Sequence, residues 1–368
     1  MVIQSRAIRK EWRARRAARG WRGLRNAALI SALSVSALGG TAAAATAGHG
    51  QHAVAKASSA PAITVAYDDT PDVGDLPSLV AIQMMRSQGY DIKEDVLNGP
   101  AAVADAIQAG DVQIGTMNGV SLFQAVASGD PFVMFTEKYA NEIVLVTKSS
   151  IKTTQQLNGA TIGVESPTAS STSLMLYTER ALHVKVNLVY ITGSAARMSA
   201  MLTGQLAGSP LELDDVVKIL GTDPTKFHIL INFDKEFPWL LGNVFFASRN
   251  YISKNSKIIQ AYTTDLYAAV ADAYAHPQPF IKKYGNLLTG YTQKVLDATM
   301  TMSAQEKIWG DDATIQVPSV SRTLSFDKQD GLLTAAQVAK LQSTLKQWFY
   351  PSFDVKAAQE YKSTSSNG

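Results

Sequence analysis

The sequence predicts an α/β protein built from two similar lobes, with a hinge and a ligand cleft between them. The main observation is an internal repeat: residues 99–110 resemble residues 193–204, and each segment is followed by a short apolar stretch. In both copies two glycines lie eleven positions apart, and Ala106 matches Ala200. The alternative is a chance match between two alanine-rich helices.

Each copy reads as a helix followed by a strand. Val103, Ala106 and Ile107 recur at helical spacing and form one apolar stripe. Gly110 and Gly204 stand where a helix ends in a left-handed turn, a conformation that glycine adopts without steric cost. We therefore expect helices over 99–110 and 193–204 and strands at 112–114 and 206–207.

The parallel extends upstream of both copies. Apolar runs typical of strands lie at 63–66 and 161–164, each followed by a polar loop, a helix (77–87 and 171–182) and another strand (92–97 and 186–191). Two β-α-β-α-β units in one chain indicate two lobes of the same architecture.

Two strands are candidates for the hinge: residues 142–147 leave the first lobe and residues 243–247 return to it. We therefore expect lobe 1 to contain residues 61–143 and 243–368, and lobe 2 to contain residues 144–242.

The first residues differ in composition from the rest of the chain. Residues 1–26 carry nine Lys and Arg against one acid, an apolar stretch follows, and small residues fill 41–47. This order predicts a secretory signal peptide over residues 1–45, cleaved near Ala45, and a flexible tether over 46–60. The other 25 Lys and Arg face 30 Asp and Glu, so this mildly acidic body is a poor candidate for binding nucleic acid.

The residue types exclude several classes of chemistry. The chain has no cysteine, which excludes disulfides, thiolate metal sites and cysteine catalysis. The histidines are isolated, and no nucleophile elbow, phosphate loop or dinucleotide fingerprint occurs. We expect no catalytic residues, no metal and no cofactor.

In parallel α/β units the loops after the strands gather at one edge, beside helix N-termini. Ser170, Ser171 and Thr172 open a helix there, either as ordinary caps or also as an anion cradle. Asn118 and Ser121 follow a strand in the same way. Asp68 and Asp69 belong to a loop in which turn chemistry explains most of the aspartates, and one of them is expected to face the cleft.

Three further residues have two interpretations each. Glu212 is either a solvated helix start or a partner for an ammonium group. Trp239 either fills the core or stacks on a ligand, the core being favoured. For Arg197 we expect a salt bridge to a neighbouring acid rather than contact with a ligand.

Three segments carry a family resemblance: residues 110–115, residues 127–131 and residues 150–164. They resemble the solute-binding proteins of bacterial ABC importers, in the branch for sulfonates, taurine, nitrate and thiamine pyrimidine precursors. The resemblance covers about residues 61–260 well and the C-terminal third only loosely. It implies a type II periplasmic-binding fold, no catalysis, and delivery of the ligand to a membrane permease.

Position by position, the resemblance implies ligand loops at 68–76, 116–121, 166–172 and 209–215. One departure is Gln205-Leu206-Ala207, where the family usually has an acidic residue, and it points to an unusual specificity. The expected ligand-binding residues are Asp68, Asp69, Leu76, Met117, Asn118, Gly119, Ser121, Asn141, Thr168, Ser170, Ser171, Thr172, Glu212 and Trp239.

We therefore expect a monomeric periplasmic protein that captures a small polar solute, with taurine or another sulfonate-type compound as the first candidate. A neutral or cationic heterocycle, such as a thiamine pyrimidine precursor, is the alternative. An enzyme on the same fold, a ligand-sensing domain of a transcription factor and an envelope sensor are the rival classes.

Overall fold

The computed structural model describes residues 62–310 and 314–365. The predicted signal peptide (1–45) and tether (46–60) lie outside the described residues. None of the helices in the described part combines the length and the hydrophobicity that crossing a bilayer requires.

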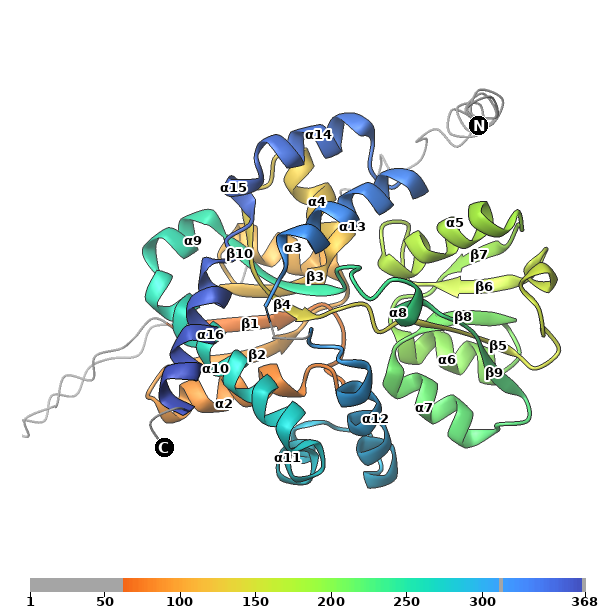
Figure 1. The fold of residues 1–368 in the computed structure, drawn as a ribbon, viewed down its shortest axis with the longest axis horizontal. Coiled ribbons are helices and arrows are strands. Elements are labelled where there is room, and N and C mark those ends of the chain that lie inside the picture. The colour runs from red at the N-terminus through yellow and green to blue at the C-terminus, as the bar shows by residue number, and fades with distance from the viewer. Residues whose placement is uncertain (1–61, 311–313, 366–368) are drawn as a thin grey trace, which may run out of the picture. The chain divides into compact units, whose positions relative to one another are not determined.

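The described chain alternates strands and helices as predicted and ends in a series of helices (Figure 1). The strands are β1 (Ile63–Tyr67), β2 (Ile92–Val96), β3 (Ile114–Asn118), β4 (Phe132–Tyr139), β5 (Val144–Lys148), β6 (Thr161–Val164), β7 (Asn187–Tyr190), β8 (Gly208–Leu211), β9 (Phe227–Asn232) and β10 (Asn243–Ser248). The helices up to β10 are α2 (Leu76–Ser87), α3 (Pro100–Ala109), α4 (Gly119–Ser128), the short 3₁₀ helix η1 (Thr154–Leu157), α5 (Ser170–Leu182), α6 (Ser194–Leu202), α7 (Leu213–Thr222) and α8 (Phe233–Glu236).

After β10 the described chain is helical. The elements are α9 (Arg249–Lys254), α10 (Ser256–Ala275), α11 (Pro277–Tyr284), the 3₁₀ helix η2 (Gly285–Leu287), α12 (Gln293–Glu306), α13 (Val317–Asp330), α14 (Ala335–Ser343), α15 (Leu345–Trp348) and α16 (Ser352–Ser365).

The strands form two five-stranded sheets of the same pattern. The first has the order β2-β1-β3-β10-β4 and the second has the order β7-β6-β8-β5-β9. In each sheet the first three strands are parallel, and the fourth is antiparallel to both of its neighbours. The prediction of two β-α-β-α-β units is confirmed. The division of the chain into lobes at residues 144 and 242 stays a prediction.

The helix–strand connections of the two repeat copies also match. The backbone N–H groups of Val112 and Leu206 both donate back to a helix carbonyl, that of Ala106 and that of Ala200 respectively. Each strand therefore begins two residues later than predicted, at Ile114 and Gly208. The reason is that Val112 and Leu206 are buried as part of the turn that closes the helix rather than in the sheet.

Apolar side chains cover both faces of the first sheet. Residues of α2 and α10 pack on one face, while α3, α4 and α13 pack on the other. All five residues of β1 are buried, whereas β7 lies at the edge of the second sheet and is largely exposed. The polar loop that follows β1, and Asn118 at the end of β3, lead into the candidate site.

Candidate functional site

A cavity of about 50 Å³ lies where the ends of the two sheets face each other. The first sheet contributes the residues after β1, the last residue of β3 and those around the end of β4, and the second sheet contributes the residues after β6 and β8. The segment that joins β4 to β5 and the residues just before β10 complete the wall. The predicted meeting of strand ends from both halves is therefore observed.

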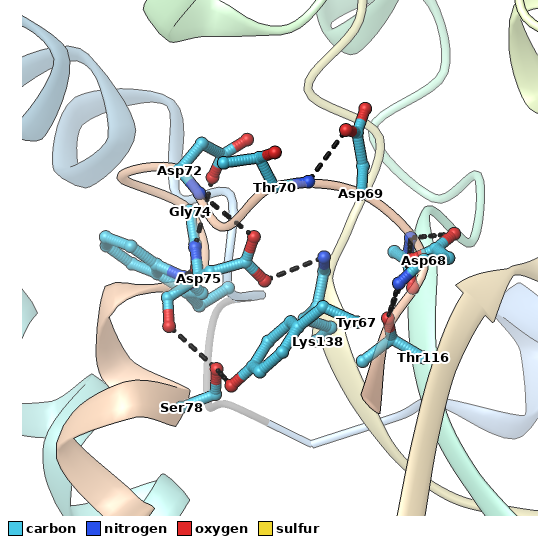
Figure 2. Close-up of polar contacts among 12 residues, drawn as sticks. Tyr67, Asp68, Asp69, Thr70, Asp72, Gly74, Asp75, Ser78, Thr116 and Lys138 are labelled. Carbon is cyan, nitrogen blue, oxygen red and sulfur yellow. Dashed lines mark hydrogen bonds and ion pairs between the residues drawn. The ribbon is translucent and has the colours of Figure 1, made fainter. Parts of the chain in front are cut away.

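Asp68 follows β1 directly and is held from two neighbouring strands. The hydroxyl of Thr116 donates to Asp68 Oδ1 over 2.6 Å, and Asn243 Nδ2 lies 3.3 Å from both carboxylate oxygens. Figure 2 shows Asp68 beside Thr116 and Asp69 turned away from them. Asp68 is thus fixed by groups on β3 and β10, while Asp69 is more exposed.

The loop that follows, from Asp72 to Asp75, is closed by its own aspartates. The backbone N–H of each donates to the other's carboxylate, over 3.2 and 3.1 Å. The indole of Trp309 donates to the carbonyl of Gly74 over 2.8 Å. This exchange is the turn chemistry predicted for the aspartate-rich loop, and it orders Asp72 at the cavity wall.

Lys138 on β4 forms a buried ion pair with Asp75, 2.7 Å from Nζ to Oδ1 (Figure 2). Burial lowers the pKa of Lys138, but the carboxylates of Asp75, Asp68 and Asp72 outweigh it and raise that pKa. Lys138 is therefore positively charged and already paired.

The second sheet supplies the opposite wall. Glu165 follows β6 and Glu212 precedes α7, while Ser170 and Ser171 open α5. Arg197 on α6 is buried, and its Nη1 donates to the carbonyl of Ile191 over 3.2 Å. The expected salt bridge of Arg197 is not among the ion pairs of the described residues, because this guanidinium is turned to a backbone carbonyl and to the cavity.

Carboxyl groups dominate the charge of the cavity. Burial raises the pKa of Glu165 to about 7. Burial also raises the pKa of Glu142 well above its ordinary value, and Asp72 and Asp214 raise it further. The pKa of Glu212 is raised well above its ordinary value by burial and by Glu142 and Asp69. Crowded carboxylates that have lost their water favour either protons or a bound cation.

The structure brings half of the predicted ligand-binding residues to the cavity. Those that line it are Asp68, Asp69, Asn118, Asn141, Ser170, Ser171 and Glu212. Of these, Asn118 caps α4 by accepting from the N–H of Ser121, and Asn141 donates to the carbonyl of Phe233. Ligand binding by each of them stays a prediction.

The other seven lie elsewhere. Leu76, Gly119 and Thr172 are buried behind the wall, and Trp239 packs against Phe237 and Phe326. Met117, Ser121 and Thr168 line a separate, more open groove of about 400 Å³.

Several lining residues were not among those expected from the sequence, including Lys138, Glu142, Glu165 and Asn243, and Arg197 was expected in a salt bridge rather than at the cavity. Glu142 and Asn243 belong to the two segments predicted to cross between lobes, so their place in the chain was a usable signal. Lys138 and Arg197 lie within a strand and a helix, where no local pattern sets them apart.

Three carboxylates have a metal-binding arrangement, and two of them, Asp72 and Glu212, line the cavity. Ligand atoms of Asp72, Glu212 and Asp214 all lie within 4.8 Å of one another. The expectation of no metal rested on spacing along the chain. Asp72 is far from the other two in the sequence, and the three come together only through the facing of the two sheets.

Comparisons with known proteins support the fold. A family model described as "ABC transporter, phosphonate, periplasmic substrate-binding protein" matches residues 78–179. A comparison with curated protein sequences gave no match.

Similar solved structures cover most of the chain. One is the ligand-binding component of an ABC-type import system from Staphylococcus aureus with zinc bound: TM-score 0.66, 14% identity, 80% of this chain and 98% of that one covered. Another is the alkanesulfonate-binding protein SsuA from Xanthomonas axonopodis pv. citri bound to MOPS, with a TM-score of 0.60 and 18% identity; the match covers 77% of this chain and 98% of that one. A third is the periplasmic aliphatic sulphonate binding protein SsuA from Escherichia coli, with a TM-score of 0.57 and 16% identity; the match covers 76% of this chain and 96% of that one. The predicted periplasmic-binding fold and the resemblance stated from the sequence are confirmed.

Proposed function

We propose that this protein is the substrate-binding component of an ABC import system and that its solute carries a positive charge. The observation that carries the charge assignment is the composition of the cavity wall. Seven carboxyl side chains line it, against two basic ones, Lys138 and Arg197; the seven are Asp68, Asp69, Asp72, Asp75, Glu142, Glu165 and Glu212.

The two basic side chains do not balance this wall. Lys138 is paired with Asp75, so Arg197 is the remaining basic group among the lining residues. A purely anionic solute such as nitrate would have to approach several carboxylates in a site with little water, which costs free energy. A cation gains from the same field, and it replaces protons on carboxyls whose pKa values are raised.

The class of protein is supported by the family match over residues 78–179 and by the fold. We propose accordingly that the chain binds rather than transforms its solute, works in the periplasm after removal of a signal peptide near Ala45, acts as a monomer and hands the solute to a membrane permease. The acidic wall shifts our ligand assignment from a simple sulfonate toward the cationic alternative.

A zwitterion such as taurine is the second candidate, and one observation favours it. Arg197 and the start of α5, with Ser170 and Ser171, line the same cavity as the carboxylates. A helix N-terminus with free backbone N–H groups and a guanidinium suits a sulfonate. The ammonium of taurine would then lie against the carboxylates.

Three small solutes separate these possibilities by calorimetric titration: ethylamine carries only the ammonium, ethanesulfonate only the sulfonate, and taurine both. We expect measurable binding of ethylamine or taurine and none of ethanesulfonate. Tighter binding of ethanesulfonate than of ethylamine would contradict a cation-selective site. Native mass spectrometry of the freshly purified protein would identify any solute that is retained.

Glu212→Gln tests the wall directly. Loss of one charged hydrogen-bond partner weakens an ammonium ligand by about 1–3 kcal/mol. Asp105→Asn is the matched control, because Asp105 is an exposed carboxylate on α3 outside the cavity. Equal affinity of the Glu212→Gln variant and the wild type would remove Glu212 from the site.

A further inference from the structure

The carboxylates of Asp72, Glu212 and Asp214 converge on one point between the two sheets. Asp72 comes from the loop after β1, and the other two come from the start of α7. Their ligand atoms lie within 4.8 Å of one another. Oxygen atoms that each lie 2.0–2.6 Å from a shared metal ion are separated by distances of this size.

A fourth carboxylate provides an independent observation. Glu142, in the segment between β4 and β5, is only 2% exposed, and its Oε1 has no hydrogen-bond partner in the described structure. Glu142 Oε1 and Asp72 Oδ1 both lie beside Gly74, at 3.3 and 3.0 Å from the position that a Cβ would occupy there. A buried carboxylate oxygen without a donor is costly, and this one lines the cavity that Asp72 and Glu212 also line.

Asp214 has one oxygen engaged and one free. Its Oδ2 accepts from Lys218 Nζ and from the hydroxyl of Tyr291, both over 2.7 Å. Its Oδ1 is buried and has no hydrogen-bond partner in the described structure. The neighbouring lysines are already committed: Lys218 also binds Asp215, and Lys138 binds Asp75. The cluster therefore retains unsatisfied oxygen atoms after these two lysines have been paired, and Arg197 is the one basic side chain of the cavity wall without an ion pair among the described residues.

The chemistry of the donors selects the kind of cation. All four are carboxylates, and the cavity is lined by neither histidine nor cysteine. Oxygen-only sites suit Mg²⁺, Ca²⁺ and Mn²⁺, whereas nitrogen and sulfur ligands suit softer ions. The cavity of about 50 Å³ holds an ion with a few water molecules more readily than an organic molecule.

We infer that the solute of this cavity is a hard divalent metal ion, held by Asp72, Glu212 and Asp214 and drawn further by the buried carboxylate of Glu142 on the same wall. This inference rests on the proposed function, capture of a cationic solute by the same acidic wall, and names the cation. Because the ligands come from both sheets and from the segment that joins them, the ion also ties the two sheets together.

Mn²⁺ is the test ion, because its free form gives an electron paramagnetic resonance signal that disappears on binding. The full chain is treated with EDTA, dialysed free of chelator and titrated with Mn²⁺, in parallel with calorimetry. We expect one ion per chain, displaced by Ca²⁺ in competition. The isosteric variants Asp72→Asn and Glu142→Gln should each bind at least about tenfold more weakly, and Asp105→Asn should bind as the wild type does.

The thermal unfolding midpoint of each protein, measured with and without Mn²⁺, shows whether a variant that binds poorly is nevertheless folded. Wild type and Asp105→Asn should rise in midpoint with Mn²⁺. Asp72→Asn and Glu142→Gln should be at least as stable as the wild type without metal, because each removes a buried carboxyl group, and their midpoints should rise less with Mn²⁺. Failure of the wild type to bind Mn²⁺, or equal binding by Asp72→Asn and Glu142→Gln, would overturn the metal assignment.

The ethylamine and taurine titrations, repeated on the metal-free protein, separate this inference from the function on which it rests. Binding of either without Mn²⁺ binding leaves the cationic-solute function standing and rejects the metal. Absence of binding by all three rejects both.

Discussion

Two buried carboxylates share one serine where α13 meets α5. The hydroxyl of Ser173 lies within hydrogen-bond distance of Asp327, at 3.2 Å, and of Asp330. A serine hydroxyl has one proton to donate, so the second contact requires a proton on a carboxyl group. Burial raises the pKa of Asp330 to about 6, and burial together with Asp330 raises the pKa of Asp327 well above its ordinary value.

This pair makes stability depend on pH. The folded pKa of Asp330 is above its ordinary value of 3.8, so the folded state holds a proton that the unfolded state has lost. The stability that this extra proton contributes is therefore fully present below about pH 4 and is lost as the pH rises through about 6. We expect Asp330→Asn to flatten this dependence and to raise the free energy of unfolding at pH 8 by about 1–3 kcal/mol.

Urea unfolding of both proteins between pH 4 and pH 8 measures the effect. The side-chain amide introduced by this substitution can still accept from the N–H of Leu332, as the carboxylate of Asp330 does, so the helix end is retained. Asp105→Asn serves again as the control and should follow the wild-type profile. Parallel profiles of Asp330→Asn and the wild type would show that Asp330 ionises normally.

Single residues of the site were predictable where a local pattern placed them. Asp68, Asn118 and Ser170 reach the cavity because each follows a strand or opens a helix, which a sequence records directly. Lys138 and Arg197 line the same cavity from within β4 and α6. The residues next to Lys138 and Arg197 in the sequence do not indicate that these two side chains face the cavity, because the cavity is formed by strands and helices far away in the chain.

At the scale of elements, the repeat was the most informative feature. Gly110 and Gly204 both have a positive φ, 86° and 84°, and both follow helices that end with the same backbone hydrogen bonds. The helix-to-strand turn is a local structure, so residues in it determine it. The antiparallel strands β5 and β10 are different. Each lies between two other strands of its sheet, and it reaches that position because the chain passes from one sheet to the other just before it.

The chain passes between the two sheets twice, from β4 to β5 (the first crossing) and from β9 to β10 (the second crossing). Gly242 lies in the second crossing, immediately before β10. A Cβ at this position would lie 2.3 Å from the carbonyl oxygen of Ala140 in the first crossing. Backbone atoms cannot rotate away as a side chain can, so the two crossing segments would have to separate. We expect Gly242→Ala to lower the free energy of unfolding by about 3 kcal/mol and to weaken ligand binding.

Gly221→Ala is the matched control for this substitution. Gly221 lies within α7, and a Cβ there meets no atom within 4 Å. Alanine is the better helix former by up to about 1 kcal/mol, so this variant should be as stable as the wild type or more so. Urea unfolding measures the stability of both variants. A Gly242→Ala protein as stable as the wild type would mean that the two segments that join the sheets are loosely packed against each other.

At the scale of the whole described molecule, the helices after β10 bind the two sheets together. Phe326 of α13 belongs to the apolar cluster of the second sheet, and α12 packs on α7. The resemblance found in the sequence covered the C-terminal third only loosely, and no motif there indicated contact with the second sheet. Such contacts depend on amphipathic helices whose partners a sequence does not name.

The hydroxyl of Tyr291, just before α12, donates to Asp214 Oδ2 of α7 over 2.7 Å. This bond joins the helices after β10 to the second sheet beside the candidate site, and it belongs to the arrangement in which the cavity is enclosed. If the halves open about the crossing segments, the bond breaks, so it favours the enclosed state over the open one.

Removing that hydroxyl should therefore loosen the molecule without unfolding it. One hydrogen bond contributes about 1 kcal/mol, so Tyr291→Phe should reduce ligand affinity about fivefold through the closing equilibrium. Small-angle scattering should show a larger radius of gyration for the ligand-free variant than for the ligand-free wild type. Saturating ligand should bring both to the same smaller value, because ligand binding then holds the halves together. Radii that do not respond to ligand in either protein would show that these halves do not move, and that the cavity fills through side-chain motion alone.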